Sequence, residues 1–166
     1  MTPRIERPAM EAYGVPVDTA GALDWAWGRE RMVSSRSYWV VTVSVAAEPF
    51  AMPVWGVWMD EPEGFWFSCA PTAAKVGHLS ANPKVTVMAD STAEVVSVHG
   101  RAQVADADQA AAAIEAMLLK YWRPAEFEAS RRFLASNAIV HVRPTRAYGI
   151  AETEAEFSTS ATRWVW

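Results

Sequence analysis

The chain has 166 residues and a mass of 18.3 kDa, which is the usual length of one domain. Hydrophobic residues make up 51% of the sequence and include 9 tryptophans, so a chain that is disordered throughout is excluded. The 15 basic and 19 acidic residues give a net charge of −4, and no basic run exceeds two residues, which argues against a general nucleic-acid-binding protein.

The first half of the chain predicts an arm, a helix and a series of strands. Residues 1–18 contain three prolines and a glycine, so we expect an extended, irregular arm followed by a single domain over residues 19–166. Helical spacing of apolar residues predicts a helix over about 20–33, capped by Asp18 or Thr19. Aromatic and β-branched residues then predict strands over 37–45, 52–59 and 64–69, and their short turns indicate an antiparallel meander.

The second half continues the meander with helices inserted between strands. Gly100 marks a possible bulge, and Pro144 places part of the last strand at a sheet edge. Six strands in meander order without a βαβ unit predict a mainly β fold with flanking helices, a six-stranded antiparallel β-barrel. The expected elements are helices over 72–80, 107–121 and 125–135, strands over 84–90, 94–106 and 139–151, and a tail over 152–166.

Several kinds of chemistry are excluded by what the sequence lacks. The single cysteine, Cys69, rules out an intramolecular disulfide, and with three scattered histidines it offers no metal-ligand spacing. The sequence has neither an apolar run of about 18 residues nor a signal-peptide pattern, so we expect no membrane segment and a cytoplasmic protein. No nucleophile or P-loop motif is present, which favours a binding protein or an enzyme whose cofactor carries the reaction.

The segment after the third predicted strand has the features of an anion site. This strand leads through Ser68 and Cys69 into a turn, and a helix with Lys75 in its first turn follows. Free N–H groups at a helix start, hydroxyl groups and an ammonium group suit a phosphate. The alternative is that Thr72 is only a helix N-cap and Lys75 a solvated surface lysine.

Five segments follow one another along the chain: YWVVTV, PVWGVW, GFWFSCAPTAAKVGHLSANPKVTV, EVVSVHGRAQV and the closing ATRWVW. Their resemblance, over roughly residues 22–166, is to the pyridoxamine 5′-phosphate oxidase-like family of flavin or deazaflavin oxidoreductases, in its actinobacterial type. It implies a six-stranded split β-barrel (an FMN-binding split barrel) and a homodimer with two cofactor sites at the subunit interface.

The resemblance also implies where FMN, or alternatively coenzyme F420, would lie. The second strand is expected to run beside the ring, and the end of the third strand beside the ribityl and phosphate groups. A Ser-Arg-Lys turn that commonly binds the phosphate is represented here by Ala73, Ala74 and Lys75, with Thr72 as a partial replacement. The cofactor-binding residues expected in this way are Pro53, Val54, Trp55, Gly56, Ser68, Cys69, Thr72 and Lys75.

The loss of the arginine weakens the expected phosphate contact. A charged hydrogen bond contributes about 1.5–3 kcal/mol, which is roughly a factor of ten to a hundred in affinity. Weak FMN binding, F420 binding in another pose and loss of cofactor binding all stay open. The acidic composition provides no obvious basic groove for the polyglutamate tail of F420, whereas the actinobacterial resemblance favours F420.

Other candidate residues each have two interpretations. In the tail, Arg163 is expected to bind an anionic group and Trp164 to stack on a ring, or else this part of the tail seals the dimer interface. Either Trp55 or Trp58 is expected near the ring, but not both. Cys69 is either a thiol next to the flavin or a small buried residue. Arg101 either faces the phosphate or is a solvated strand residue.

Two functions remain after these considerations. The first is an oxidoreductase that transfers a hydride between FMN or F420 and a small organic substrate, without a catalytic side chain that can be named. The second is a non-catalytic protein on the same scaffold that binds a flavin, a haem or another planar ligand. Neither requires nucleic acid or a membrane as a partner.

Overall fold

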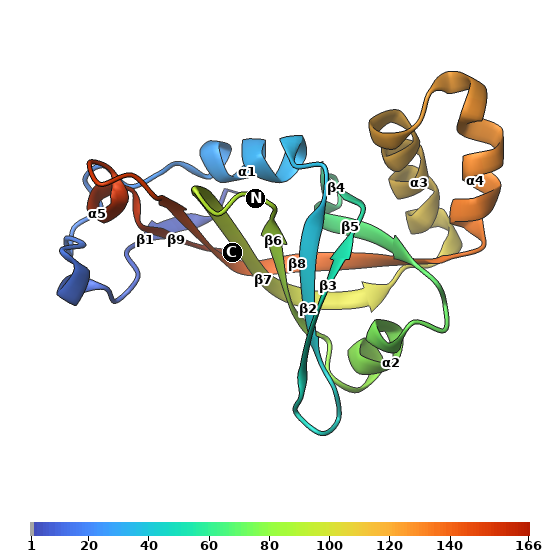
Figure 1. The fold of residues 1–166 in the computed structure, drawn as a ribbon, viewed down its shortest axis with the longest axis horizontal. Helices are drawn as coiled ribbons and strands as arrows, with labels where there is room; N and C mark the ends of the chain where they lie inside the picture. The colour runs from blue at the N-terminus through green and yellow to red at the C-terminus, as the bar shows by residue number, and fades with distance from the viewer. Residues whose placement is uncertain (1) are drawn as a thin grey trace.

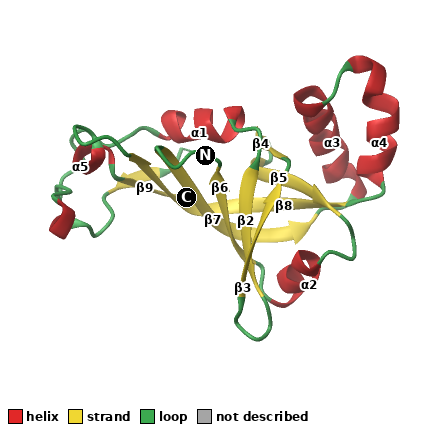
Figure 2. Ribbon diagram, viewed as in Figure 1, coloured by secondary structure: helices red, strands yellow, loops and turns green. Residues whose placement is uncertain are grey.

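The structure, a computed structural model, describes residues 2–166 and consists of an antiparallel sheet with helices around it (Figures 1 and 2). Its strands are β1 (Arg4–Glu6), β2 (Tyr38–Val43), β3 (Pro49–Val54), β4 (Gly56–Asp60), β5 (Glu63–Cys69), β6 (Lys84–Ala89), β7 (Glu94–Val104), β8 (Ala138–Ala151) and β9 (Thr162–Val165). Its helices are α1 (Trp25–Ser34), α2 (Ala74–Ala81), α3 (Ala107–Tyr121), α4 (Phe127–Ala135) and α5 (Phe157–Ser160), with short 3₁₀ turns at Glu11–Tyr13 and Pro124–Glu126. None of the helices in this described part of the chain is long and apolar enough to span a membrane.

The sheet is split because β8 has two different partners along one of its edges. The strand order is β1-β9-β8-β7-β6-β2-β3, and β5 pairs with the first part of β8 and with β4. Strand β9 pairs only with the later residues 146–149 of β8. Among the described strands β3 has β2 as its one neighbour and β4 has β5, so the sheet is not closed. This arrangement agrees with the predicted mainly β fold and with a split barrel.

Pro144 and Gly100 lie at the point where β8 changes partners. Pro144 follows the residues that pair with β5 and precedes those that pair with β9, so its missing N–H is accommodated there. The register between β7 and β8 shifts between His99 and Gly100, which confirms the predicted bulge. A side chain at Gly100 would place its Cβ 2.3 Å from the carbonyl oxygen of Arg143, so only glycine fits.

Some predicted boundaries were wrong. The strand expected over 52–59 is two strands, β3 and β4, which are interrupted at Trp55, and the described residues form nine strands where six were expected. The first helix begins at Trp25 and has no side-chain cap at Asp24, so neither Asp18 nor Thr19 caps it. The arm over 1–18 includes strand β1, which pairs with β9 at the other end of the sequence.

One side of the sheet packs into a core rich in aromatic residues. Helix α1 lies against β4 and β7, and its Trp25 contacts three other indoles edge to face at 4.8–5.2 Å between ring centroids. Trp164 on β9 is fully buried in this core. A Cβ on Gly149 would lie 2.2 Å from the Trp164 ring, so the glycine makes room for the indole.

Helices α3 and α4 pack on a second apolar cluster beside β4, β5 and the start of β8, and Figure 1 shows the two helices side by side at one end of the molecule. Trp66 on β5 is buried between the sheet and these helices. His141 on β8 stacks on it with 4.0 Å between centroids and an 8° angle. The His141 Nε2 atom lies 3.1 Å from the main-chain oxygen of Glu63. The imidazole is therefore buried between the Trp66 indole and the main chain at Glu63.

Acid should destabilise the protein through this histidine. Burial lowers the pKa of His141 from its usual value of 6.5, and the nearby charge of Arg143 lowers it further. Below pH 6.5 the unfolded chain takes up a proton at this histidine more readily than the native state does. The contribution of neutral His141 to the free energy of unfolding is therefore present above pH 6.5 and is lost as the pH falls below it. We expect the melting temperature to decrease from pH 7.5 to 5.5, and to decrease less in the variant His141→Phe. An unchanged pH slope in that variant would contradict this prediction.

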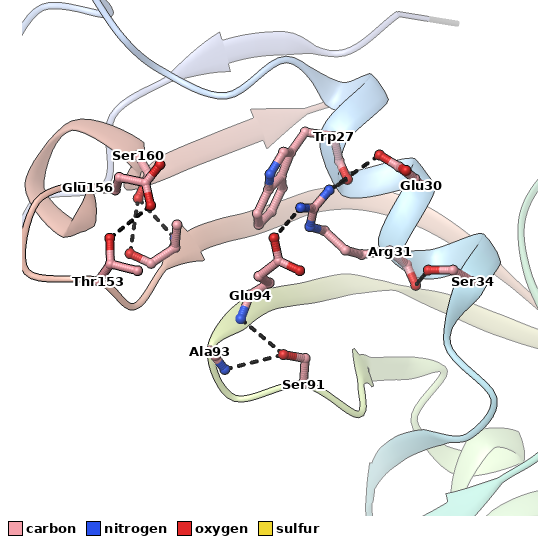
Figure 3. A network of polar contacts seen from close by, with 11 residues as sticks. Trp27, Glu30, Arg31, Ser34, Ser91, Ala93, Glu94, Thr153, Glu156 and Ser160 are labelled. Carbon is pink, nitrogen blue, oxygen red and sulfur yellow. Dashed lines mark hydrogen bonds and ion pairs between the residues drawn. The ribbon is translucent and has the colours of Figure 1, made fainter.

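Arg31 ties α1 to the start of β7 (Figure 3). Its guanidinium group lies 3.8 Å from the centroid of the Trp27 ring and forms an ion pair with Glu94. A second carboxylate, that of Glu30, lies 3.4 Å away. The helix is thus attached to the sheet by a cation that has acidic and aromatic partners.

Arg7 joins the arm to the C-terminal segment. Its guanidinium group donates hydrogen bonds to the main-chain oxygens of Asp18, Ala20, Thr159 and Ala161 at 2.6–2.8 Å. One side chain therefore satisfies four carbonyl groups from two segments that are distant in the sequence.

Candidate functional site

A cavity of about 400 Å³ lies between the β3–β4 junction, the end of β5 and the helices α2, α3 and α4. We call it the aromatic cavity. Its walls are mainly apolar, and a few polar groups lie at one side. The lining residues are Pro53, Val54, Trp55, Ser68, Cys69, Ala70, Lys75, Met117, Tyr121, Trp122, Phe133, Leu134 and Asn137. Its volume is in the range of small-molecule sites.

Trp55 forms one wall of the aromatic cavity. It interrupts the two strands and is 49% exposed. Its ring stacks on Tyr121 of α3 at 5.0 Å with an 8° angle and meets Trp122 edge to face at 5.6 Å. The guanidinium carbon of Arg36 lies 6.0 Å from the centroid of the Trp55 ring. Stacked aromatic side chains of this kind present a flat surface to a ligand.

Tyr121 and Lys120 hold the backbone of Gly56 next to this wall. The Tyr121 hydroxyl group accepts a hydrogen bond from the Gly56 N–H at 2.9 Å and lies 2.8 Å from the carbonyl oxygens of Gly56 and Arg36. The Lys120 ammonium group donates to the Gly56 oxygen at 3.2 Å and to the hydroxyl of Tyr38 at 2.6 Å. Burial lowers the pKa of Lys120 to about 8. The main-chain polar groups of Gly56 thus already have partners within the chain.

The polar side of the aromatic cavity is formed by Lys75, Cys69 and Ser68. Lys75 is in the first turn of α2 and half-buried, and among residues 2–166 it has no carboxylate partner. Burial raises the pKa of the Cys69 thiol, and the nearby Lys75 charge opposes this rise. The Ser68 hydroxyl accepts a hydrogen bond from the Asn137 amide at 2.9 Å. The cavity therefore contains one ammonium group without a counter-ion beside neutral polar groups.

The structure brings six of the ten predicted site residues together. These six line the aromatic cavity: Pro53, Val54, Trp55, Ser68, Cys69 and Lys75. Gly56 adjoins the cavity but is buried. Thr72 is exposed in the turn before α2 and does not line the cavity, and the N-cap position is Ala73, so the alternative interpretation of Thr72 as the N-cap was wrong. Of the two candidate tryptophans, Trp55 lines the cavity and Trp58 is buried in the core.

The tail residues lie elsewhere. Trp164 is fully buried and donates its indole N–H to the Leu23 carbonyl at 3.0 Å, so within the chain it has no ring face open to a ligand. Arg163 forms an ion pair with Glu6 across the β1–β9 pair. Figure 1 shows these strands at the end of the molecule opposite α3 and α4. Within one chain, Arg163 and Trp164 therefore do not lie beside Lys75.

The sequence analysis missed the contribution of α3 and α4. Tyr121, Trp122 and Phe133 line the aromatic cavity, and Phe133 is 58% exposed. In the sequence, Tyr121 shares one apolar stripe of its helix with Ile114, Met117 and Leu118. Helical periodicity identifies an apolar face, but it does not say which strand that face meets. The one available indication was a set of aromatic residues at the end of one helix and the start of the next.

The lining residues fit a flat, phosphorylated cofactor, and they offer its phosphate group a single charged side chain. Apolar and aromatic walls suit a ring system, and the unpaired Lys75 ammonium suits an anion. Ala73 and Ala74 offer neither charge nor hydroxyl to that anion. No cluster of three or more His, Cys, Asp or Glu side chains that could hold a metal ion occurs in the described part of the chain.

Comparisons with known proteins give one family-model match and a set of structures with a similar fold. The model of the pyridoxamine 5′-phosphate oxidase family matches residues 29–151, which is most of the chain. No curated protein sequence matches the chain significantly.

Solved structures with the same fold have low sequence identity to this chain. A haem-binding protein from Mycobacterium smegmatis superposes with a TM-score of 0.61 at 18% identity, over 78% of this chain and 55% of that one. The conserved hypothetical protein Rv2991 from Mycobacterium tuberculosis gives 0.60 at 15% identity, over 89% and 88%. HutZ, the haem storage protein from Vibrio cholerae, gives 0.56 at 15% identity, over 72% and 86%. At these identities the similarity establishes the fold.

Proposed function

Because the chain belongs to the pyridoxamine 5′-phosphate oxidase family, we propose that it binds FMN, or alternatively coenzyme F420, and transfers a hydride between this cofactor and a small organic substrate. The observation that carries the proposal is the aromatic cavity, whose stacked Trp55–Tyr121 wall and unpaired Lys75 ammonium face the same 400 Å³ space. This combination suits a planar ring with an anionic chain.

The residues of the cavity have distinct roles in this proposal. Trp55 contacts the ring system, and the apolar residues from α3 and α4 exclude water from it. Lys75 binds the phosphate, assisted by the hydroxyl of Ser68. Without an arginine at position 74, this phosphate has one charged contact, so we expect modest affinity.

The cofactor would supply the hydride chemistry, and the protein would supply binding and orientation. The titratable groups that line the cavity support this division. The pKa values of Cys69 and Tyr121 are both raised, mainly by burial, so these groups keep their protons at neutral pH and are poor general bases. Proton exchange with solvent would complete the reaction.

A homodimer is part of the proposal. Four large apolar side chains on or next to strands β2 and β3 are between 42% and 53% exposed: Trp39, Phe50, Met52 and Trp55. Such a concentration of exposed apolar residues supports a protein interface close to the aromatic cavity.

A non-catalytic planar-ligand protein is the second candidate. Next to the aromatic cavity, and sharing Lys75 with it, is an apolar cavity of about 230 Å³ lined by His78, Phe50 and Met52. The Nδ1 atom of His78 lies 3.0 Å from the Thr42 hydroxyl, which leaves Nε2 available to a ligand. Two of the structural neighbours are a haem-binding protein and a haem storage protein. These observations support haem as the alternative ligand.

A titration separates these candidates. FMN, F420 and haem would each be added to the apoprotein while tryptophan fluorescence and the visible spectrum are recorded, and light scattering would test for a dimer. The proposal expects quenching by FMN or F420, reduced quenching in Trp55→Leu, and a bound cofactor that can be reduced and reoxidised. No quenching at roughly tens of micromolar cofactor would count against the proposal of a flavin or deazaflavin oxidoreductase.

The same titration tests the second candidate. A shift of the Soret band of haem on binding, which is lost in His78→Ala, would support a haem-binding protein.

A further inference from the structure

Three cations lie side by side across neighbouring strands, away from the aromatic cavity. Lys84 on β6 is directly opposite Arg101 on β7, and Arg101 is directly opposite Arg143 on β8. All three side chains are exposed. Residues directly opposite in antiparallel strands point to the same face and have Cβ atoms about 5 Å apart. We call these three residues the cation row.

The bulge adds a fourth cation to this face. His99 pairs with Arg146, whereas Arg101 pairs with Arg143, so one extra residue of β8 is inserted between the two pairs. In a regular strand, residues 143 and 146 would point to opposite faces. Because of the inserted residue, both arginines lie on the face that carries Arg101.

Residues 2–166 provide no counter-ions for these cations. In the part of the chain that the structure describes, no carboxylate forms an ion pair with Lys84, Arg101, Arg143 or Arg146. Seven other arginines do have such partners, as Arg31 does with Glu94 in Figure 3. Like charges directly opposite one another destabilise a sheet, and they occur here in a chain of net charge −4.

Two cavities adjoin Arg101 and give an anion room to bind. One, of about 370 Å³, is lined by Lys84, Arg101 and Arg146 and includes the hydroxyl-bearing residues Thr86 and Thr145. The other, of about 340 Å³, is lined by Arg101 and Arg143 with Gln103. None of these residues lines the aromatic cavity, so this is a separate location.

The neighbouring histidines respond to the same positive charge. Burial lowers the pKa of His99 and of His141, and the nearby Arg146 and Arg143 respectively lower these pKa values further. The local potential on this face is therefore positive, although the whole chain is acidic.

We propose that the cation row and Arg146 form a binding site for a small molecule with a diphosphate or another pair of adjacent phosphate groups. Guanidinium groups bind phosphate oxygens through two parallel hydrogen bonds, and several neighbouring cations match a ligand with several charges. A small molecule fits better than a nucleic acid, because the positive residues occupy one confined site and the chain as a whole is acidic.

Isothermal titration with inorganic pyrophosphate tests the site in a low-salt buffer. The parent protein should bind pyrophosphate, and Arg101→Gln should weaken binding by about tenfold or more. Arg132→Gln removes the same charge from the exposed surface of α4 and should bind like the parent. Without ligand, Arg101→Gln should melt no lower than the parent, because the substitution relieves repulsion within the cation row. Equal binding by the parent and Arg101→Gln would overturn the proposal.

Further experiments identify what binds at the cation row. Pyrophosphate should raise the melting temperature of the protein more than sodium chloride does at the same ionic strength. An equal rise with chloride would show that the anion only screens the positive charges, and it would overturn the proposal. Tighter binding of a short DNA duplex than of ADP would assign the face to nucleic acid and overturn the proposal. If pyrophosphate does not bind and Arg101→Glu dissociates an oligomer, the face contacts a second copy instead. Lys84→Ala should weaken the binding of pyrophosphate and leave the binding of FMN unchanged. The proposal for this site and the proposal for the cofactor site can therefore be contradicted independently.

Discussion

Replacing Lys75 by alanine should weaken FMN or F420 binding at least about tenfold, with little change in the melting temperature of the apoprotein. Lys75 is the one cation that lines the aromatic cavity among the described residues. A phosphate bound there would lose its only charged contact, and a charged hydrogen bond contributes about 1.5–3 kcal/mol. The side chain has no ion pair in the described structure, so its removal should cost the apoprotein little.

Two variants make this result specific. Lys84→Ala removes a lysine that lines a different cavity and should bind the cofactor like the parent. Ala74→Arg, at an exposed position in the first turn of α2, should tighten binding by providing the arginine that the turn lacks. Equal cofactor affinity in Lys75→Ala and the parent would show that the phosphate is not bound at this end of the cavity.

Replacing Trp164 by alanine should lower the free energy of unfolding by about 3–5 kcal/mol, the range found for large aromatic residues in protein cores. The indole is fully buried, packs edge to face on Trp25 at 5.2 Å and donates a hydrogen bond to Leu23. Alanine would leave a cavity bordered by Gly149, which cannot fill the space. Chemical denaturation followed by circular dichroism measures the loss.

The neighbouring residue distinguishes a structural role of the tail from a ligand-binding role. Arg163→Ala removes an ion pair with Glu6 near the surface and should cost much less stability than Trp164→Ala. If cofactor binding within the subunit does not involve the tail, Arg163→Ala should also leave FMN affinity unchanged. A stable Trp164→Ala protein with weakened FMN binding would support the interpretation that Trp164 stacks on the ligand.

The elements with strong local patterns could be predicted from the sequence. The helix over 107–121 was predicted with its observed bounds because alanines and a regular apolar stripe favour it, and the β7 bulge was indicated by a glycine within an apolar strand. The break at Trp55 was missed because residues 52–59 keep a strand-like composition through it. The break marks a change of partner strand, since β3 pairs with β2 and β4 pairs with β5.

The candidate site was predictable where the residues are close in sequence. Ser68, Cys69 and Lys75 are separated by a single turn and fall in the same cavity. The opposite wall comes from α3 and α4, and its position depends on how these helices pack on Trp66 and Ile139. Arg163 and Trp164 lie away from this cavity within the chain, because their partners, Glu6 and Trp25, are near the start of the sequence.

The pairing of β1 with β9 has a consequence for how quickly the native state can form. Glu6 and Arg163 are 157 positions apart, and Arg7 reaches carbonyl groups at a similar separation. Contacts between such distant segments require a large loss of chain entropy before they become favourable, and folding rates fall as sequence separation rises. The local β6–β7 hairpin and the α3–α4 pair have no such delay. We therefore expect the two remote ends to dock late, so that unfolding begins by their release and amide protons of β1 exchange before those of β7.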